Sequence, residues 1–337
     1  MFKSTKYLVT TIGITASLMG CSSANRSNIA SAQSKPKVVA SHNIICDLVE
    51  TIASDTVDLT CLIKANQDPH TYNPTPSQLK AMEEAQLVLY GGYQLEPKIT
   101  KLLEATDEEI PKIALYEQVV AEPIMAEHEH SSEEVEHEHE HEHEDSSAAE
   151  TKSQPELEPD PHVWHSIENT VAMVEFLKTI LLQLNSQQAE LYLTNSTTFT
   201  EQLWQLEAWI KDQIATIPQG QKVLVTTHDS LNYYVRTYNL EDYLTLQGLS
   251  AEASPTASEV KNLAEAIEQT GVPTIFVEST KSDRVISNVA RAADVKLSDS
   301  ELYVDGLGSA ENYTEMMSYN TCAIVNGLGG ECEPFNP

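Results

Sequence analysis

The chain has 337 residues and a formal net charge of −31 at pH 7. That length can bury a substantial core and favours two domains. The negative charge argues against binding to nucleic acid, or to an anionic membrane through charge, because either partner would repel the protein. Nearly half of the charge is local, since residues 122–160 contain fifteen acidic residues and one lysine.

The first 21 residues have the features of an export signal. Lys3 and Lys6 precede a run of apolar and small residues that is too short for a stable membrane span. The sequence LMGC at 18–21 is similar to a bacterial lipobox, which predicts lipidation of Cys21; the alternative is an ordinary signal peptide with an incidental cysteine. We therefore expect an exported protein, in the periplasm or at the cell surface, that a lipid anchors to the membrane. Residues 22–35 are expected to form a flexible tether.

Export places the other four cysteines in an oxidising compartment, where an even number favours disulfides. Three connectivities are possible. The local pairing of Cys46 with Cys61 and of Cys322 with Cys332 is preferred, because each pair lies within one local unit. Each bond would close a short loop and contribute about 3 kcal/mol on the chain-entropy model. A zinc-thiolate site is disfavoured, since no C-x-x-C spacing occurs.

In the first half, short apolar runs alternate with helical patterns. The runs 37–40, 57–63 and 87–90 predict strands, and the apolar spacing through 45–52 predicts a helix. This alternation is typical of a parallel sheet with crossover helices. We assign residues 36–185 to an N-terminal α/β lobe.

A long helical pattern follows and joins this lobe to a second one. Residues 186–217 keep one apolar stripe until a proline stops it, which predicts a linking helix about 45 Å long. Strand and helix patterns then alternate again through a C-terminal lobe, 218–337. The predicted fold class is α/β, with two lobes that contain parallel sheets and are joined by one long rigid helix.

Three histidines stand in contexts that hold a side chain still. His70 and His162 each end an Asp-Pro-His tripeptide, whose proline stiffens the backbone, and His228 follows the strand pattern at 223–225. Ligands of open α/β sheets bind beyond the carboxyl ends of the strands, and imidazole suits transition metals. The alternative is that each Asp-Pro-His is an ordinary loop tripeptide. His42 and His165 have weaker claims as ligands, and His165 is expected at the surface or beside a ligand.

Four segments resemble the metal-binding lipoproteins that serve ABC importers. Residues 68–77, DPHTYNPTPS, resemble that family's DPHxYEPTPSD segment, with Asn73 in place of its glutamate. The segments DPHVW at 160–164, TTHDS at 226–230 and LYVDGLG at 302–308 resemble its later ligand segments, in the same order. These matches span nearly the whole mature chain, and the acidic, histidine-rich segment before the second of them resembles the zinc-importing branch.

The resemblance implies a metal site in the cleft between the lobes. Its ligands would be His70, His162 and His228, with Asp305 or a water as the fourth. Manganese members carry a carboxylate at the third position, so His228 favours zinc, because manganese prefers oxygen ligands. Asp305 also has an ordinary interpretation as a hydrogen-bonding loop residue.

The histidine-rich segment requires a separate interpretation. Residues 122–154 have almost no apolar periodicity, which predicts a disordered surface loop. Its histidines are expected to bind several zinc ions weakly, because ordering the loop costs free energy. Two interpretations stay open: a zinc collector or sensor near the importer, and a solvated linker that binds metal incidentally. The histidines are His128, His130, His137, His139, His141 and His143.

The sequence therefore predicts an extracytoplasmic zinc receptor, not an enzyme, that delivers Zn²⁺ to the membrane permease of an ABC importer. We expect a monomer whose lobes move little and whose metal is released on docking to the permease. One alternative is a manganese receptor. Another is a zinc hydrolase, which the absence of an H-E-x-x-H motif disfavours. Glu278 would be the best candidate for its general base, although a structural role suits this residue better.

Overall fold

The computed structural model describes residues 34–106, 109–128, 156–249 and 255–336. The expected export signal, Cys21 and most of the tether lie outside these residues, as does most of the histidine-rich segment. Among the described helices, none combines the length and the apolar character needed to cross a bilayer.

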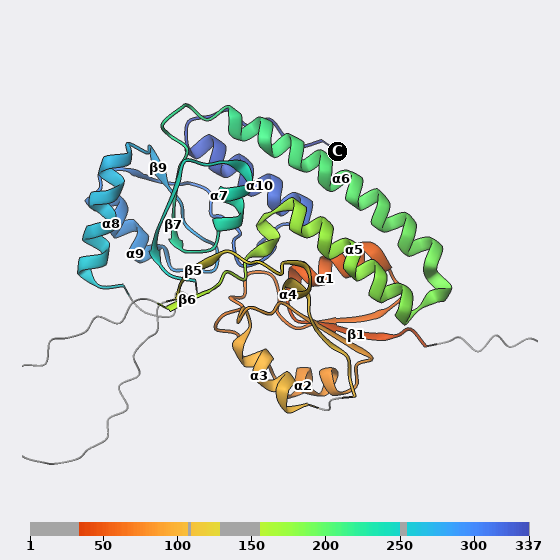
Figure 1. The fold of residues 1–337 in the computed structure, drawn as a ribbon. Helices are drawn as coiled ribbons and strands as arrows, with labels where there is room; N and C mark the ends of the chain where they lie inside the picture. The colour runs from red at the N-terminus through yellow and green to blue at the C-terminus, as the bar shows by residue number, and fades with distance from the viewer. Residues whose placement is uncertain (1–33, 107–108, 129–155, 250–254, 337) are drawn as a thin grey trace, which may run out of the picture. The chain divides into compact units, whose positions relative to one another are not determined.

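The N-terminal part contains a four-stranded parallel sheet with the strand order β2-β1-β3-β4 (Figure 1). The predicted β1, β2 and β3 are present, but β2 is shorter than the run 57–63, although the amides of Leu62 and Ile63 still donate to backbone carbonyls at the end of β1. The strands are β1 Lys37–Ala40, β2 Asp58–Cys61, β3 Leu87–Tyr90 and β4 Lys112–Ala114. The helices are α1 Asn43–Ala53, α2 Pro76–Glu83, α3 Pro97–Ala105 and α4 Leu115–Val119.

Two long helices follow this sheet. A 3₁₀ turn, η1 Val163–His165, leads into α5 Ile167–Leu184, and a second one, η2 Ser186–Gln188, leads into α6 Ala189–Ala215. Helix α6 has 27 residues and is about 40 Å long. The predicted linking helix at 186–217 is therefore correct in position, but it begins three residues later, where η2 replaces the first turn, and ends two residues earlier.

The C-terminal part has only short strands. The parallel pair β7 Val223–His228 and β8 Asp242–Gln247 is followed by a second pair, β9 Thr274–Ile275 and β10 Lys296–Leu297. The amide of Phe276 donates to the carbonyl of Val225, so the chain continues beside β7 after β9 ends at Ile275. The helices are α7 Asn232–Tyr238, α8 Ala257–Thr270, α9 Asp283–Ala292 and α10 Tyr313–Gly327.

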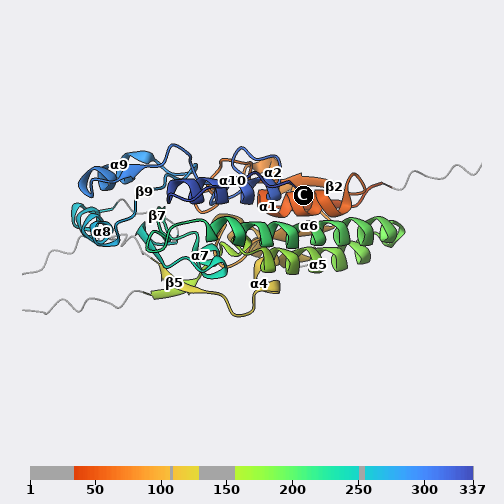
Figure 2. The ribbon, with the colours of Figure 1, turned by 90° about the horizontal axis from the view of Figure 1, so that it is seen from above.

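A short antiparallel ribbon flanks the histidine-rich segment. Strand β5 Met125–His128 pairs with β6 Glu156–Pro159, and the amide of Asp160 donates to the carbonyl of Ile124 just beyond the ribbon (Figure 2). The predicted disordered loop at 122–154 is therefore wrong at its start. The pairing joins strands from both ends of the segment, so no periodicity within one of them could reveal it.

The largest hydrophobic core continues through both parts of the molecule. It joins Leu48 of α1 and Leu177 of α5 to Leu203 of α6 and Ile324 of α10, and all four side chains are fully buried. Figures 1 and 2 show α6 running beside α5, and α1 and α10 also pack against it. A smaller core lies between α8, α9 and their strands, and another lies under α2 and α3. If the N-terminal and C-terminal parts moved far apart, the largest core, which they share along α6, would be exposed. The packing therefore favours small motions between the two parts.

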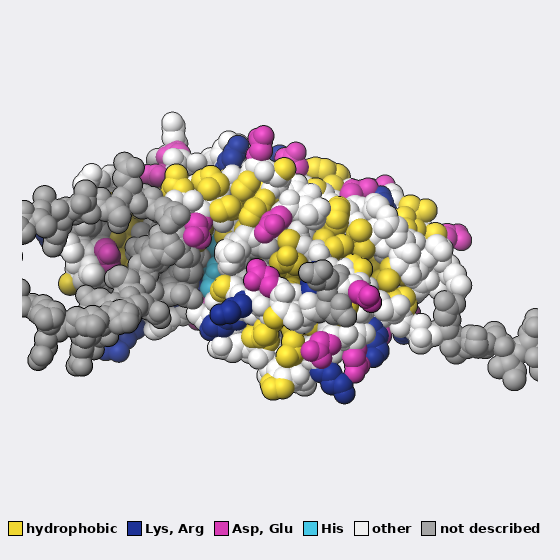
Figure 3. Space-filling model, turned by 60° about the horizontal axis from the view of Figure 1, so that its bottom comes forward, with side chains coloured by type: hydrophobic (Ala, Val, Ile, Leu, Met, Phe, Trp, Pro, Cys, Tyr) yellow, Lys and Arg dark blue, Asp and Glu magenta, His cyan; other side chains and the backbone are white. Residues whose placement is uncertain are grey.

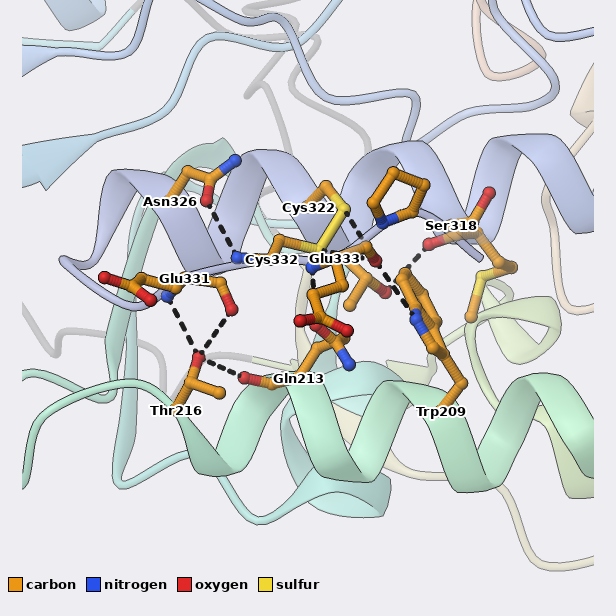
Figure 4. The surroundings of a disulfide bond; sticks show 12 residues. Trp209, Gln213, Thr216, Ser318, Cys322, Asn326, Glu331, Cys332 and Glu333 are labelled. Carbon is orange, nitrogen blue, oxygen red and sulfur yellow. Dashed lines mark hydrogen bonds between the residues drawn. A yellow bond between two sulfur atoms is a disulfide. The ribbon is translucent and has the colours of Figure 1, made fainter. Parts of the chain in front are cut away.

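Both predicted disulfides are present. The bond Cys46–Cys61 joins α1 to the end of β2, and Cys322–Cys332 joins α10 to the C-terminal segment. Figure 4 shows that this segment passes between α10 and α6. Three side chains of the long helix or its C-cap hydrogen-bond the backbone of residues 331–333: Trp209, Gln213 and Thr216. The bond and these contacts hold the chain end against the long helix.

Candidate metal centre

Four side chains from distant parts of the chain meet in the interior. His70 lies in the loop between β2 and α2, His162 directly before η1, His228 at the end of β7, and Asp305 in the loop before α10. Each has 3% or less of its surface exposed. One potential ligand atom from each lies within 4.8 Å of all the others. Figure 3 shows a small area of histidine on one face of the molecule.

The four groups converge on one carboxylate oxygen. Oδ1 of Asp305 lies 3.5 Å from Nε2 of His70, 3.5 Å from Nε2 of His162 and 3.3 Å from Nε2 of His228. Both Asp305 Oδ1 and His228 Nε2 are buried without a hydrogen-bond partner. Buried polar atoms are rarely left unpaired, so two such atoms facing each other fit a site for a cation. Three imidazoles and one carboxylate oxygen are a donor set that suits zinc.

The two Asp-Pro-His segments adopt the same local structure. Oδ1 of Asp68 accepts a hydrogen bond from the backbone amide of His70, and Oδ1 of Asp160 accepts one from the amide of His162, each at 2.9 Å. Asp160 Oδ1 also lies 2.8 Å from Nδ1 of His162. Because that ring donates through Nδ1, its neutral form directs the lone pair of Nε2 at the other three groups. The repeated tripeptide thus fixes the backbone of two candidate ligands and the ring of one.

Glu278 positions the third imidazole. Its Oε1 accepts the amides of Thr227 and His228, each at 2.9 Å, and its Oε2 lies 2.5 Å from Nδ1 of His228. Glu278 is fully buried. Both of its oxygens are therefore engaged in holding His228 and its neighbour, so Glu278 is not free to act as the general base of a hydrolase.

The carboxylate of Asp305 is held from behind. Its Oδ2 accepts a hydrogen bond from Thr280 Oγ1 at 2.5 Å and lies 3.2 Å from Nζ of Lys281, which is also 2.6 Å from Oδ2 of Asp68. Thr280 and Lys281 have no local signal in the sequence. Thr280 lies 25 residues from Asp305, and Lys281 lies 213 residues from Asp68, so no local pattern could predict either contact.

His42 and His165 are buried but do not join the four groups. His42 donates through Nε2 to the carbonyl of Asp305, and His165 donates through Nε2 to the carbonyl of Val304, each at 2.9 Å. Burial lowers the pKa of His42 to about 4 and that of His165 to about 3, so both are neutral donors near pH 7. Of the two positions expected for His165, the surface one is wrong, because the side chain is fully buried, whereas its contact with Val304 fits a residue beside a ligand. Both rings instead support the loop that carries Asp305.

The ionisation states within the site differ strongly. Burial lowers the pKa of His70 to about 4. Burial also opposes the charged form of His228, but Glu278 and Asp305 overcome it and raise its pKa to about 10. Burial likewise disfavours the charged forms of Asp305 and Lys281, yet Lys281 and His228 hold the pKa of Asp305 well below its usual value, and Asp305 and Asp68 raise that of Lys281. Near pH 7, His228, Asp305 and Lys281 are therefore charged, whereas His70 is neutral.

The histidine-rich segment is described only at its start. His128 is the last residue of β5, in register with Glu156 of β6. The other five candidate histidines, His130, His137, His139, His141 and His143, lie outside the described residues. The ribbon ends at Pro159, so the segment joins the chain directly before Asp160 and His162.

A buried carboxylate near His42 gives a testable pH dependence. Glu96 has 1% of its surface exposed and accepts hydrogen bonds from Ser41 Oγ and the amide of Gly91. Burial raises its pKa from 4.5 to about 7 in spite of these bonds. The folded state therefore binds a proton more tightly than the unfolded state. This group contributes stability that is present below pH 4.5 and is lost as the pH rises through 7.

Replacing Glu96 with glutamine removes that titration but keeps an oxygen acceptor for the Gly91 amide. We expect the free energy of unfolding of the wild type, relative to Glu96→Gln, to fall by about 3 kcal/mol between pH 5 and pH 8. Urea denaturation of both metal-free proteins at the two pH values measures this difference. Histidine titrations are common to both proteins and cancel. A difference that stays constant with pH would contradict a raised pKa at Glu96.

Comparisons with known proteins agree with this fold. A family model described as the periplasmic component A of the zinc-uptake complex, ZnuA, matches residues 38–327. The chain is 25% identical over 296 residues to the manganese-binding lipoprotein MntA of Halalkalibacterium halodurans, covering 87% of this chain and 88% of that protein. It is 28% identical over 324 residues to the manganese ABC transporter substrate-binding lipoprotein PsaA of Streptococcus pneumoniae, covering 92% and 94%.

A solved structure gives the same result. The periplasmic zinc-binding protein TroA from Treponema pallidum superposes with a TM-score of 0.74 at 26% identity, and the match covers 87% of this chain and 99% of TroA. The fold and the comparisons define the class of protein as substrate-binding receptors rather than enzymes. Within that class, the chain belongs to the ZnuA family, which the family model describes as the periplasmic component of zinc uptake.

Proposed function

We propose that this protein is the extracytoplasmic receptor of a metal ABC importer, that it captures Zn²⁺ through His70, His162, His228 and Asp305, and that it delivers the ion to the membrane permease. The observation that carries the proposal is the pair of unpartnered buried atoms, His228 Nε2 and Asp305 Oδ1, facing each other beside two further imidazole nitrogens. Zinc accepts four such donors at close range.

The proposal extends to how the protein is held and how it works. Lipidation at Cys21 would anchor an exported monomer to the membrane, in keeping with relatives that are named as lipoproteins. The core shared along α6 supports release through small changes near the site rather than through wide opening. The histidine-rich segment, which enters the chain next to Asp160 and His162, would collect zinc near the site or serve only as an acidic linker.

Manganese is the second candidate, and a specific observation favours it: several relatives are named as manganese-binding. Against it, manganese prefers oxygen-rich coordination, whereas the four groups here offer three nitrogens and one unpaired oxygen. A hydrolase is not supported, because Glu278 is fully engaged with His228 and its neighbours.

A competitive titration with zinc and manganese tests the proposal. Protein that starts after Cys21 would be titrated with and without residues 129–155, in the presence of a chromogenic chelator. We expect one tight zinc site that survives the deletion and binds zinc more tightly than manganese. Loss of tight binding on deletion would assign the metal to the histidine-rich segment. Equal or tighter binding of manganese would refute the zinc assignment and leave the receptor function standing.

A further inference from the structure

The two oxygens of Asp305 have different surroundings. Oδ1 faces the three Nε2 atoms at 3.3 to 3.5 Å and has no hydrogen-bond partner. Oδ2 points the other way, at Thr280 Oγ1 and Lys281 Nζ. The carboxylate therefore directs Oδ1 at the candidate metal site, while Oδ2 is bound by Thr280 and Lys281.

Lys281 is itself held in place. Its side chain is only 8% exposed, and its Nζ lies between Oδ2 of Asp305 at 3.2 Å and Oδ2 of Asp68 at 2.6 Å. The other oxygen of Asp68 accepts the amide of His70. One ammonium group thus connects the carboxylate ligand from the C-terminal part with the loop of a histidine ligand from the N-terminal part.

A carboxylate that binds a metal through both oxygens would have to turn Oδ2 away from these donors. That rotation would leave the ammonium of Lys281, which is only 8% exposed, without one of its anions, and the hydroxyl of Thr280 without its acceptor. Breaking a buried ion pair in this way is strongly unfavourable. The surroundings of Oδ2 therefore resist two-oxygen coordination.

We propose that Lys281 and Thr280 are positioning residues that restrict Asp305 to one-oxygen coordination and thereby favour zinc over manganese. The inference rests on the proposed metal site. Zinc is satisfied by four donors in a tetrahedron, whereas manganese prefers more donors and more oxygens, which a second carboxylate oxygen would help to supply. The positive charge of Lys281 repels every divalent cation alike, so its charge by itself leaves the ratio of the two affinities unchanged.

The test compares substitutions that differ in what they do to Oδ2. Lys281→Met keeps much of the side-chain volume and removes the ammonium, and Lys281→Arg keeps a cation. Asp68→Asn weakens the same ion-pair network but touches no atom of Asp305, and its Oδ1 still accepts the amide of His70. Competitive titrations give the zinc-to-manganese affinity ratio, and X-ray absorption of the manganese-loaded protein gives the coordination number.

We expect Lys281→Met to lower the zinc-to-manganese affinity ratio by about tenfold or more and to raise the manganese coordination number. Lys281→Arg and Asp68→Asn should keep the wild-type ratio. If Lys281→Met does not fold, Thr280→Val provides the test, since it leaves the ion pairs in place and should shift the ratio in the same direction.

An unchanged zinc-to-manganese affinity ratio in folded Lys281→Met or, where that variant does not fold, in Thr280→Val would overturn the inference. If both affinities rise by the same factor, Lys281 acts only through its charge. Failure of the proposed function looks different, because the wild-type protein would then lack a tight site for either metal.

Discussion

Replacing His162 with alanine should lower the affinity for zinc by more than about a hundredfold. Loss of a residue that only supports a metal ligand can lower the affinity by about a hundredfold, and loss of the ligand itself should cost more. The substitution removes one of the three converging nitrogens and leaves Asp160 without its ring partner. Competitive zinc titration of protein that lacks residues 129–155 measures the effect without interference from the other histidines.

His165→Gln is the matched control for this substitution. His165 is equally buried and lies three residues away, but its Nε2 faces the carbonyl of Val304 rather than the site, and a glutamine amide can also donate to that carbonyl. We expect the zinc affinity of this control to lie within about threefold of that of the wild type. Such a difference corresponds to less free energy than a typical hydrogen bond contributes. A similar loss in both variants would mean that packing around the site, rather than ligation by His162, sets the affinity.

Replacing Leu203 with alanine should destabilise the fold by about 2 to 5 kcal/mol, the usual range for removing a buried leucine side chain. Leu203 is fully buried in the core that joins α1, α5, α6 and α10. Its loss leaves a cavity at the contact between the two parts of the molecule. Urea denaturation of the metal-free protein measures the change in free energy of unfolding.

Leu193→Ala in the same helix is the control for this effect. Leu193 is 49% exposed, so the identical substitution removes far less buried surface and should change stability by about 0.5 kcal/mol or less. Equal effects at the two positions would contradict the burial pattern of α6. Two separate unfolding transitions in the wild type would contradict a core shared by both parts.

The local chemistry of the chain predicts much of the site. Proline stiffens the approach to His70 and His162, and strand-to-helix succession places His228 at a carboxyl end, so three of the four converging residues have a signal in the sequence. Asp305 required the family resemblance, since an aspartate in a Val-Asp-Gly turn is otherwise unremarkable.

The residues behind the ligands have no comparable signal. Lys281 pairs with Asp68 across 213 positions, and His42 supports the Asp305 carbonyl across 263. The same reason explains the missed elements of the fold. Strand β10 has only two residues, and β5 and β6 are defined by each other across the histidine-rich segment. The long helix α6 was predicted because its apolar stripe is repeated over many turns.

Anomalous X-ray scattering at the zinc edge, from crystals of zinc-loaded protein without residues 129–155, tests the central claim most directly. We expect one strong peak that lies about 2.0 to 2.2 Å from Nε2 of His70, His162 and His228 and from Oδ1 of Asp305. A peak at other residues, or no ordered peak once residues 129–155 are removed, would contradict the assignment of these four residues as the zinc site.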